Sequence, residues 1–198
     1  MSAPGWPAVL RDGDLVLRPL RRGDAAAWRS VRAANATWLR PWEATDPDGT
    51  PPVRTFGGLV RELSRQGRSG TAMPFALEVD GALAGQVTVG GITWGAMRSA
   101  HVGYWIDGRL AGRGHVPTAV ALVTDHCLRT GLHRVEVNIR PENAASLRVV
   151  EKLGFRPEGL RERFLHIDGA WCDHLTFALT RDELPHGLLA RYRTSSPR

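Results

Sequence analysis

The sequence predicts an α/β fold in which one mixed sheet carries helices on both faces. Three observations support this class. Apolar residues recur at helical spacing between Val116 and Cys127, apolar residues alternate in a strand that follows, and Asp80-Gly81 separates two apolar runs. A helix between two strands favours a parallel crossover, whereas a two-residue Asp-Gly turn favours an antiparallel hairpin. The sheet should therefore contain both kinds of strand pair.

The residues before the central helix predict one strand, two helices and three further strands. Asp24 is a candidate N-cap for the first helix, and Gly67 is a candidate stop for the second. A connection rich in Pro, Gly and Asp, residues 41–52, separates the two helices. In chain order the expected elements are a strand at Leu15–Pro19, helices at Asp24–Ala34 and Arg54–Gln66, and strands at Phe75–Val79, Leu83–Ile92 and Ala100–Ile106.

The central helix is the best-marked element of the second half. Its apolar residues follow one another at spacings of four, three and four, so they share one buried face: Val116, Val120, Val123 and Cys127. The elements expected after it are a strand at Val135–Ile139, a helix from Asn143 to Leu153 that Gly154 ends, and a hairpin of Arg163–Ile167 and Trp171–Leu179. We expect one domain over residues 1–184 and a basic, flexible tail over residues 185–198.

The composition indicates a globular protein with a sizeable core. Of 198 residues, 42% are hydrophobic and 23% are charged, which is typical of folded domains. No apolar run approaches the roughly 18 residues of a membrane span, and residues 1–7 do not resemble a signal peptide. Cys127 and Cys172 lack metal-ligand spacing, which favours free thiols in a reducing compartment. We expect a cytoplasmic protein without a metal, either a monomer or a homodimer.

The positive charge suits a phosphorylated or acidic partner. The net charge is +6, and Lys152 is the only lysine among its arginines. Such a field attracts polyphosphate cofactors, acidic partners or RNA-rich assemblies. Because the chain has no basic run interleaved with aromatic residues and no known nucleic-acid module, we expect no direct nucleic-acid recognition.

Two turns at helix starts form the candidate site. The segment Arg109-Leu-Ala-Gly112-Arg-Gly114 lies between a strand and the central helix, and it offers backbone N–H groups with little obstruction from side chains. Such amides and the helix dipole both favour phosphate. One strand later, Asn143-Ala-Ala-Ser146 places an amide and a hydroxyl three residues apart. The pair predicts a phosphate-bearing cofactor whose reactive end lies between two helices.

Together these motifs resemble those of the GNAT superfamily of N-acetyltransferases, most closely the RimJ/RimL branch that acetylates protein N-termini, including those of ribosomal proteins. The segments that carry the resemblance are Gly103-Tyr-Trp-Ile106, Arg109-x-x-Gly112-x-Gly114, Leu132–Val137, Asn143-x-x-Ser146, Lys152-Leu-Gly-Phe155, Trp38–Glu43 and Ile167–His174. The fold that it implies is a mostly antiparallel sheet of six to seven strands, flanked by about four helices and splayed between its fourth and fifth strands.

The resemblance implies acetyl-CoA as the acetyl donor. Backbone groups near Trp105 and Ile106 would hold the pantetheine arm and the acetyl carbonyl, while amides from Arg113 to Val116 would bind the pyrophosphate. Asn143 would hydrogen-bond the pantetheine, and Ser146 would face the sulphur. The implied cofactor-binding set is Trp105, Ile106, Arg109, Gly112, Arg113, Gly114, His115, Val116, Asn143 and Ser146.

Glu136 is the candidate general base. The reaction needs a neutral amine, and an N-terminal amine with a pKa of about 7.7–8.0 is already partly neutral at pH 7. A carboxylate acting through water therefore suffices. Glu136 lies on the strand face opposite Val135 and Val137, and the resemblance implies a base glutamate there. The alternative is a solvated glutamate on a partly open strand.

The departing thiolate needs a proton, and the usual donor is missing. Many members of the resembled family carry a tyrosine four residues after the position of Ser146, whereas this chain has Val150. The Ser146 hydroxyl is the nearest candidate, acting directly or through a relay. Alternatively, Ser146 only helps to satisfy the amides of a helix that Asn143 caps.

The acceptor residues are expected on two segments beside the cofactor. Trp38, Trp42 and Glu43 precede the second long helix, and in the resembled branch this segment borders the acceptor groove. Tyr104 lies on the strand before the phosphate turn, and Asp173 lies on the closing hairpin. The alternatives are core packing for the tryptophans and mutual pairing of Asp173 with its neighbour His174.

The expected function is transfer of acetyl from acetyl-CoA to a protein N-terminal amine, with a ribosomal protein as a possible acceptor. Two other readings stay open: acetylation of a small amine such as an antibiotic or polyamine, and a non-catalytic acyl-CoA-binding module. A dinucleotide-binding site is disfavoured, because Pro117 replaces the third glycine of that fingerprint.

Overall fold

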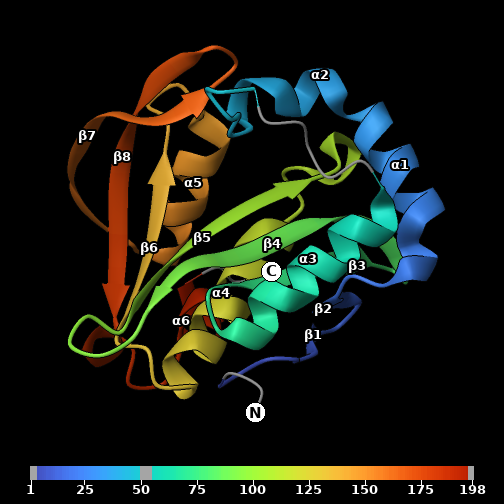
Figure 1. Ribbon diagram of the computed structural model, residues 1–198. Helices are drawn as coiled ribbons and strands as arrows, with labels where there is room; N and C mark the ends of the chain where they lie inside the picture. The colour runs from blue at the N-terminus through green and yellow to red at the C-terminus, as the bar shows by residue number, and fades with distance from the viewer. Residues whose placement is uncertain (1–3, 50–54, 196–198) are drawn as a thin grey trace.

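The computed structural model describes residues 4–49 and 55–195. Their strands form an eight-stranded sheet in the order β1-β2-β3-β4-β5-β6-β8-β7 (Figure 1). All neighbouring pairs are antiparallel except β5 and β6, which confirms the mixed, mostly antiparallel sheet. The strand count exceeds the expected six to seven, because a short first strand pairs with the second. The strands are β1 (Leu10–Asp12), β2 (Leu15–Pro19), β3 (Met73–Val79), β4 (Ala82–Thr93), β5 (Ser99–Ile106), β6 (Arg134–Ile139), β7 (Arg156–Ile167) and β8 (Ala170–Thr180).

Helices cover both faces of the sheet (Figure 1). They are α1 (Ala25–Ala34), α2 (Ala36–Leu39), α3 (Phe56–Ser69), α4 (His115–Arg129), α5 (Ala144–Leu153) and α6 (Leu188–Ser195). The main core lies between the sheet and α4–α5 and contains Phe75 and Leu77 of β3, whereas Ala76 faces a smaller cluster under α1 and α3. This alternation places one core on each side of the sheet. None of the described helices is long and apolar enough to span a bilayer.

The parallel pair β5 and β6 comes apart soon after it begins. Residues Ser99–His101 pair with Arg134–Glu136. Beyond His101, β5 runs on to Ile106 with β4 as its partner, while β6 runs on to Ile139 with β8. The predicted splay is therefore confirmed, and it leaves one backbone edge of β5 free of a strand partner.

Helix α3 differs from the helix predicted between Arg54 and Gln66. The expected start at Arg54 lies outside the described residues, and the helix continues through Gly67 until Gly70 ends it at a φ of +73°. Gly67 is instead a site of close packing, because a Cβ placed on it would lie 2.1 Å from the indole nitrogen of Trp6. The glycine reflects contact with Trp6 and not a helix stop.

Asp24 precedes α1 as predicted, but its carboxylate does not cap that helix. The carboxylate accepts hydrogen bonds from the backbone N–H of Arg21 at 2.7 Å and from the guanidinium of Arg18 at 2.8 Å. Arg18 is buried and also binds Glu78 of β3. Asp24 thus ties the start of α1 to the sheet, because a buried guanidinium needs carboxylate partners.

The C-terminal segment departs from the flexible tail expected over residues 185–198. Within the described residues, Leu188–Ser195 forms α6, which packs against α4 and α5. Leu188 is fully buried, and its backbone N–H donates to the Asp125 carboxylate at 2.6 Å. Arg191 donates to the carbonyl of Leu153 at the end of α5. Arg191, one of the arginines that suggested a solvated tail, therefore serves as a partner for a helix carbonyl, and Arg193 pairs with Asp12.

Substitution of Gly67 should test the packing of α3. Gly67→Ala forces a methyl group into the ring of Trp6, and such overpacking costs about 1–3 kcal/mol. The matched control is Gly57→Ala in the same helix, where the nearest atom lies 4.0 Å away. This control should stabilise the protein by about 0.5–1 kcal/mol. Urea unfolding of both variants measures the difference, and equal effects would contradict the assignment.

Candidate active site

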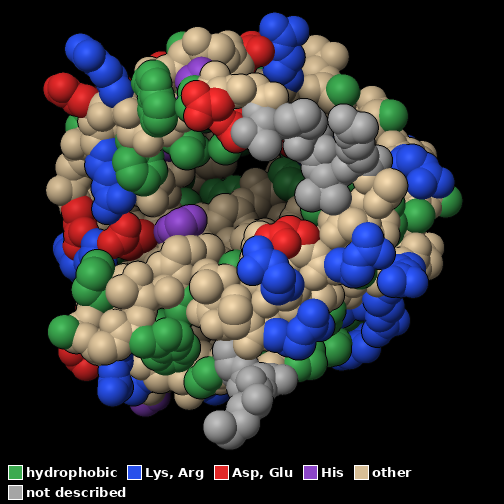
Figure 2. All heavy atoms as spheres, viewed as in Figure 1, with side chains coloured by type: hydrophobic (Ala, Val, Ile, Leu, Met, Phe, Trp, Pro, Cys, Tyr) green, Lys and Arg blue, Asp and Glu red, His purple; other side chains and the backbone are tan. Residues whose placement is uncertain are grey.

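A cavity of about 1100 Å³ opens where β5 and β6 part. Its walls come from α1, α2, β4, β5, the turn before α4, and the first turn of α5. Figure 2 shows the surface hollowed between α2 and the sheet, with acidic side chains at its rim. The sequence-predicted residues that line the cavity are Trp38, Trp42, Glu43, Tyr104, Trp105, Ile106, Gly112, Gly114, His115, Val116, Asn143 and Ser146.

One end of the cavity has the features of an anion site. Gly112 and Gly114 adopt φ values of +79° and +87°, which favour glycine and leave the backbone accessible. Gly114 is the N-cap of α4, and no described side chain caps this helix, whereas Thr55 caps α3 and Asn143 caps α5. The first N–H groups of α4 therefore remain available beside the positive end of its dipole, as phosphate binding requires.

Asp107 stabilises the turn before α4 through its carboxylate. Its buried carboxylate accepts hydrogen bonds from the backbone N–H of Arg109 at 3.0 Å and from the guanidinium of Arg109 at 2.5 Å. The Arg109 hydrogen bond lowers the pKa of Asp107 to about 2, despite the opposing effect of burial. The adjacent N–H of Gly108 donates to the side chain of Asn35, at the end of α1, at 2.9 Å. The turn is thereby fixed to the helix that leads into the acceptor side.

Trp105 shapes the wall on the α1 side. Its indole N–H donates to the Gln86 side chain at 3.4 Å, and its ring meets Trp28 edge to face at 5.4 Å. The guanidinium of Arg32 lies 5.2 Å from the ring centroid, a cation–π arrangement. Trp105 thus contributes its side chain to one wall, while its backbone belongs to the strand edge that β6 has left.

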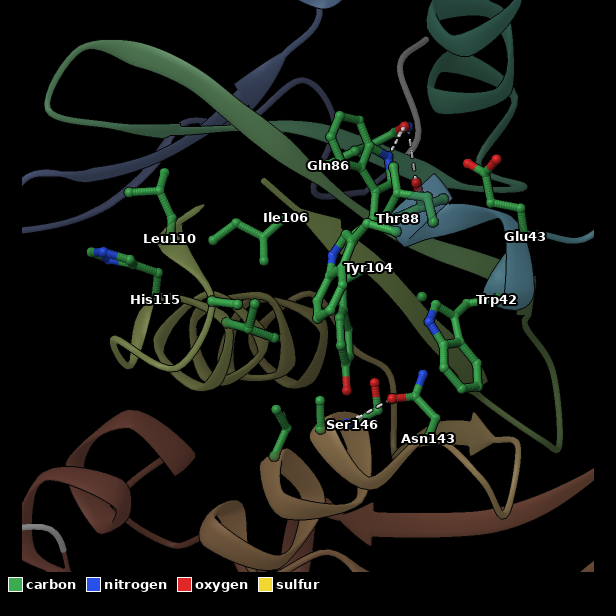
Figure 3. A pocket seen from close by; sticks show the side chains of 18 of the residues that line it. Trp42, Glu43, Gln86, Thr88, Tyr104, Ile106, Leu110, His115, Asn143 and Ser146 are labelled. Carbon is green, nitrogen blue, oxygen red and sulfur yellow. Dashed lines mark hydrogen bonds between the residues drawn. The ribbon is translucent and has the colours of Figure 1, made fainter. Parts of the chain in front are cut away.

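The first turn of α5 forms the opposite wall. The side-chain oxygen of Asn143 accepts a hydrogen bond from the backbone N–H of Ser146 at 3.1 Å, which confirms the predicted cap. The side chains of Asn143 and Ser146 lie beside the cavity, and the Tyr104 hydroxyl extends from β5 toward Ser146 (Figure 3). The hydroxyls of Tyr104 on β5 and of Ser146 on α5 therefore lie near each other.

The other end of the cavity carries aromatic and acidic side chains. Trp38 is 47% exposed, so it is not ordinary core. Trp42 lies under the guanidinium of Arg140 at 5.6 Å, and Glu43 pairs with Arg32. Figure 3 shows Trp42 and Glu43 on the same side of the cavity. This end can receive a second substrate beside its polar centre.

The structure does not bring four of the expected residues into the cavity. The carboxylate of Glu136 accepts from Arg134 and Arg161, at 2.9 Å in each case, and does not line the cavity. Asp173 accepts from the backbone N–H of Arg163 at 2.8 Å instead of pairing with His174. The side chains of Arg109 and Arg113 also lie outside the lining. The guanidinium of Arg109 pairs with the carboxylate of Asp107 instead.

Several residues that line the cavity or support its walls were not predicted from the sequence. Gln86 and Thr88 belong to β4, Arg32 belongs to α1, and Asn35 follows the last residue of α1. None belongs to a recognisable motif. The only available signal was the polar character of β4 at alternate positions, which places Gln86 and Thr88 on one face of that strand. Their convergence with β5 depends on tertiary pairing.

An anion-binding turn, a free strand edge and a polar centre in one cavity define an enzyme that transfers a group from a phosphorylated carrier to a second substrate. The chain belongs to the acetyltransferase (GNAT) domain family, whose model matches residues 14–156. It is accordingly an N-acetyltransferase. The described residues contain no group of three or more His, Cys, Asp or Glu side chains placed to hold a metal ion.

The comparisons with known proteins agree with this family. The structure of Mycobacterium smegmatis RimJ in complex with CoA-disulfide is 39% identical, with a TM-score of 0.89 over 98% of this chain and 97% of that chain. The [Ribosomal protein uS5]-alanine N-acetyltransferase of Escherichia coli (strain K12) is 29% identical over 87% of this chain and 91% of its own length. The probable N-acetyltransferase YjcK of Bacillus subtilis (strain 168) is 29% identical over 86% and 96%, respectively.

The Asp107 anchor predicts a pH-dependent stability. The folded pKa of about 2 lies below the unfolded value of about 3.9. The stabilisation is therefore present above pH 4 and disappears as the pH falls toward 2. Asp107→Asn should lower the free energy of unfolding by about 1–2 kcal/mol at pH 7, and the difference from wild type should shrink below pH 4.

Urea unfolding between pH 7 and pH 2 measures this difference. Asp14→Asn, at an exposed position, is the matched control and should stay within about 0.5 kcal/mol of wild type. A difference between Asp107→Asn and wild type that persists unchanged at pH 2 would contradict the anchor.

Proposed function

We propose that this enzyme transfers an acetyl group from acetyl-CoA to the N-terminal α-amine of a protein, with a ribosomal protein as the acceptor. The observation that carries the proposal is the continuity of the cavity. One end has an uncapped helix start beside glycine amides, the centre has Ser146 with the buried Tyr104 hydroxyl next to it, and the far end has aromatic and acidic side chains.

The described residues fit acetyl-CoA. Amides from Arg113 to Val116 would hold the pyrophosphate, since they lie at the free N-terminus of α4. The unpaired edge of β5 near Trp105 and Ile106 would receive the pantetheine amides as a further strand would. When bound, the cofactor supplies an acetyl group activated as a thioester. Ser146 lies between these two regions, where the sulphur would be placed.

A free α-amine needs little base catalysis from this site. Because about a tenth of an N-terminal amine is neutral at pH 7, transfer needs no strong base. Arg134 and Arg161 each bind one carboxylate oxygen of Glu136, so we do not retain it as the base. Glu43 lies at the other end of the cavity but pairs with Arg32, so the amine would lose its proton to water.

Relatives support a protein acceptor. The Escherichia coli relative is named for the alanine of ribosomal protein uS5, and the Mycobacterium smegmatis relative is a RimJ. The exposed Trp38 and the half-buried Trp42 at the cavity suit a peptide, whose backbone and side chains offer apolar area to both rings.

The acceptor class can be tested by thiol release from acetyl-CoA. The acceptors are peptides beginning with Ala or Ser, the same peptides with a blocked N-terminus and a free internal lysine, and a set of small amines. We expect release only with free N-termini, and mass spectrometry should place the acetyl group on the α-amine. Thiol release with small amines alone would contradict the proposal of a protein acceptor. Binding of CoA without turnover of any acceptor would contradict the proposed acetyl transfer.

We expect Trp42 to contact the acceptor peptide and not the cofactor. Trp42→Ala removes the ring at the acceptor end and should raise KM for a peptide about five- to tenfold, as for other aromatic anchors. The KM for acetyl-CoA should change less than about twofold. Trp94→Ala, which truncates an exposed tryptophan outside the cavity lining, is the matched control and should change neither constant. An effect of Trp42→Ala on acetyl-CoA alone would contradict this assignment.

A further inference from the structure

Tyr104 occupies a position that joins the core to the reacting centre. It lies on β5 opposite Val87 of β4, and its ring packs against the main core while it also lines the cavity. From there the side chain crosses the gap left by β6, and its hydroxyl points to Ser146 at the start of α5 (Figure 3). Tyr104 therefore links the two elements that the splay separates.

The Tyr104 hydroxyl is buried beside the Ser146 side chain, and no hydrogen bond of standard geometry satisfies it. Among the described residues, only this hydroxyl and that of Thr124 are side-chain polar atoms in that condition. Burial raises the pKa of Tyr104 to about 12, and the nearby Ser146 hydroxyl offsets only part of the increase. At neutral pH the phenol keeps its proton. A buried donor left unpaired costs about 1–3 kcal/mol, so its presence needs a reason.

Ser146 is held at its backbone but not at its hydroxyl. Its N–H donates to Asn143 at 3.1 Å, which fixes the turn. A serine hydroxyl has one proton and two lone pairs and rotates to suit its neighbours. If a fixed phenol donates to the serine oxygen, the serine proton is left to point elsewhere, and the open side is the cavity.

The residue at the usual tyrosine position cannot perform this task. Val150 is 1% exposed and belongs to the main core. It has no polar atom and lies one turn beyond Ser146 on α5. In this chain a hydroxyl reaches the same helix from β5 instead, through Tyr104.

We propose that Tyr104 is a positioning residue for Ser146: its hydroxyl donates to the serine oxygen and so directs the serine O–H toward the sulphur of the departing thiolate. The amine nitrogen bonds to the acetyl carbon, the carbon–sulphur bond breaks, and the electron pair remains on sulphur. The amine loses its surplus proton to water, and the thiolate is protonated from solvent after transfer. Tyr104 and Ser146 keep their own protons and stabilise the charge by hydrogen bonding.

This inference rests on acetyl transfer and not on the identity of the acceptor. The variants are therefore assayed with whichever amine the wild-type enzyme accepts. If the wild type accepts only small amines, the proposed protein acceptor fails while the role of Tyr104 is still tested. If the wild type binds CoA but acetylates nothing, both proposals are overturned, whereas CoA affinity and stability still report on folding.

Tyr104→Phe removes the hydroxyl and keeps the ring. We expect kcat to fall about tenfold, the value of one hydrogen bond, while KM for acetyl-CoA and for the amine changes less than twofold. The melting temperature should fall by no more than a few degrees, because one hydrogen bond is lost while the ring keeps its packing. Thr124→Val is the matched control: it removes the other unpaired hydroxyl, outside the cavity, and should leave kcat unchanged. A wild-type kcat in Tyr104→Phe would overturn the proposal.

A double-mutant cycle separates positioning from direct action. Ser146→Ala should reduce kcat about a hundredfold, as the loss of a charge-stabilising donor does. Adding Tyr104→Phe to Ser146→Ala should cost less than a further twofold, because the phenol then has no serine to direct. A further tenfold loss in the double variant would overturn the role through Ser146.

The pH profile provides a second readout. Tyr104 does not titrate below pH 11 in this proposal, so Tyr104→Phe should lower kcat equally between pH 6 and pH 10 and leave the apparent pKa values unchanged. Loss of a descending limb in that range would instead make Tyr104 the titrating acid and overturn positioning.

Discussion

The separation of β5 from β6 beyond His101 is the constraint on which this site depends. Each strand is held on its other side, β5 by β4 and β6 by β8, so the gap cannot close by a shift of either strand. A strand edge left open has unpaired amides and carbonyls that need partners. Because α4 follows β5 and α5 follows β6, the same separation places the starts of both helices at the cavity.

The surrounding contacts join the two ends of the cavity. Asp107 fixes the turn before α4, and Asn35 ties that turn to the end of α1, from which Trp38 and Trp42 follow. The turn before α4 and the end of the cavity that carries Trp38 and Trp42 are therefore connected through Asn35 and are not independent loops. Glu136, in contrast, serves the sheet: its two arginine partners come from β6 and β7, and it joins those strands beside the site.

Much of this arrangement could be predicted from the sequence, because it depends on local chemistry. The glycine-rich turn, the Asn143 cap and the strand pattern depend on residues close in the chain, and the structure confirms them. The failures have a common cause. Gly67 and the basic segment that forms α6 were interpreted from composition, whereas their state depends on distant partners, Trp6 for the glycine and Asp125 for the start of α6.

The sequence by itself determined the family, the order of the long helices and of most strands, the glycine turn and the capping of α5 by Asn143, since backbone conformation and capping act over a few residues. Only the tertiary structure decided which polar side chains lie close to one another. It removed Glu136 from the cavity, since arginines from two strands converge on it, and it brought Tyr104 to Ser146 across the parted strands. Such contacts depend on strand register and helix packing, which bring together residues as far apart in the sequence as Tyr104 and Ser146, 42 positions.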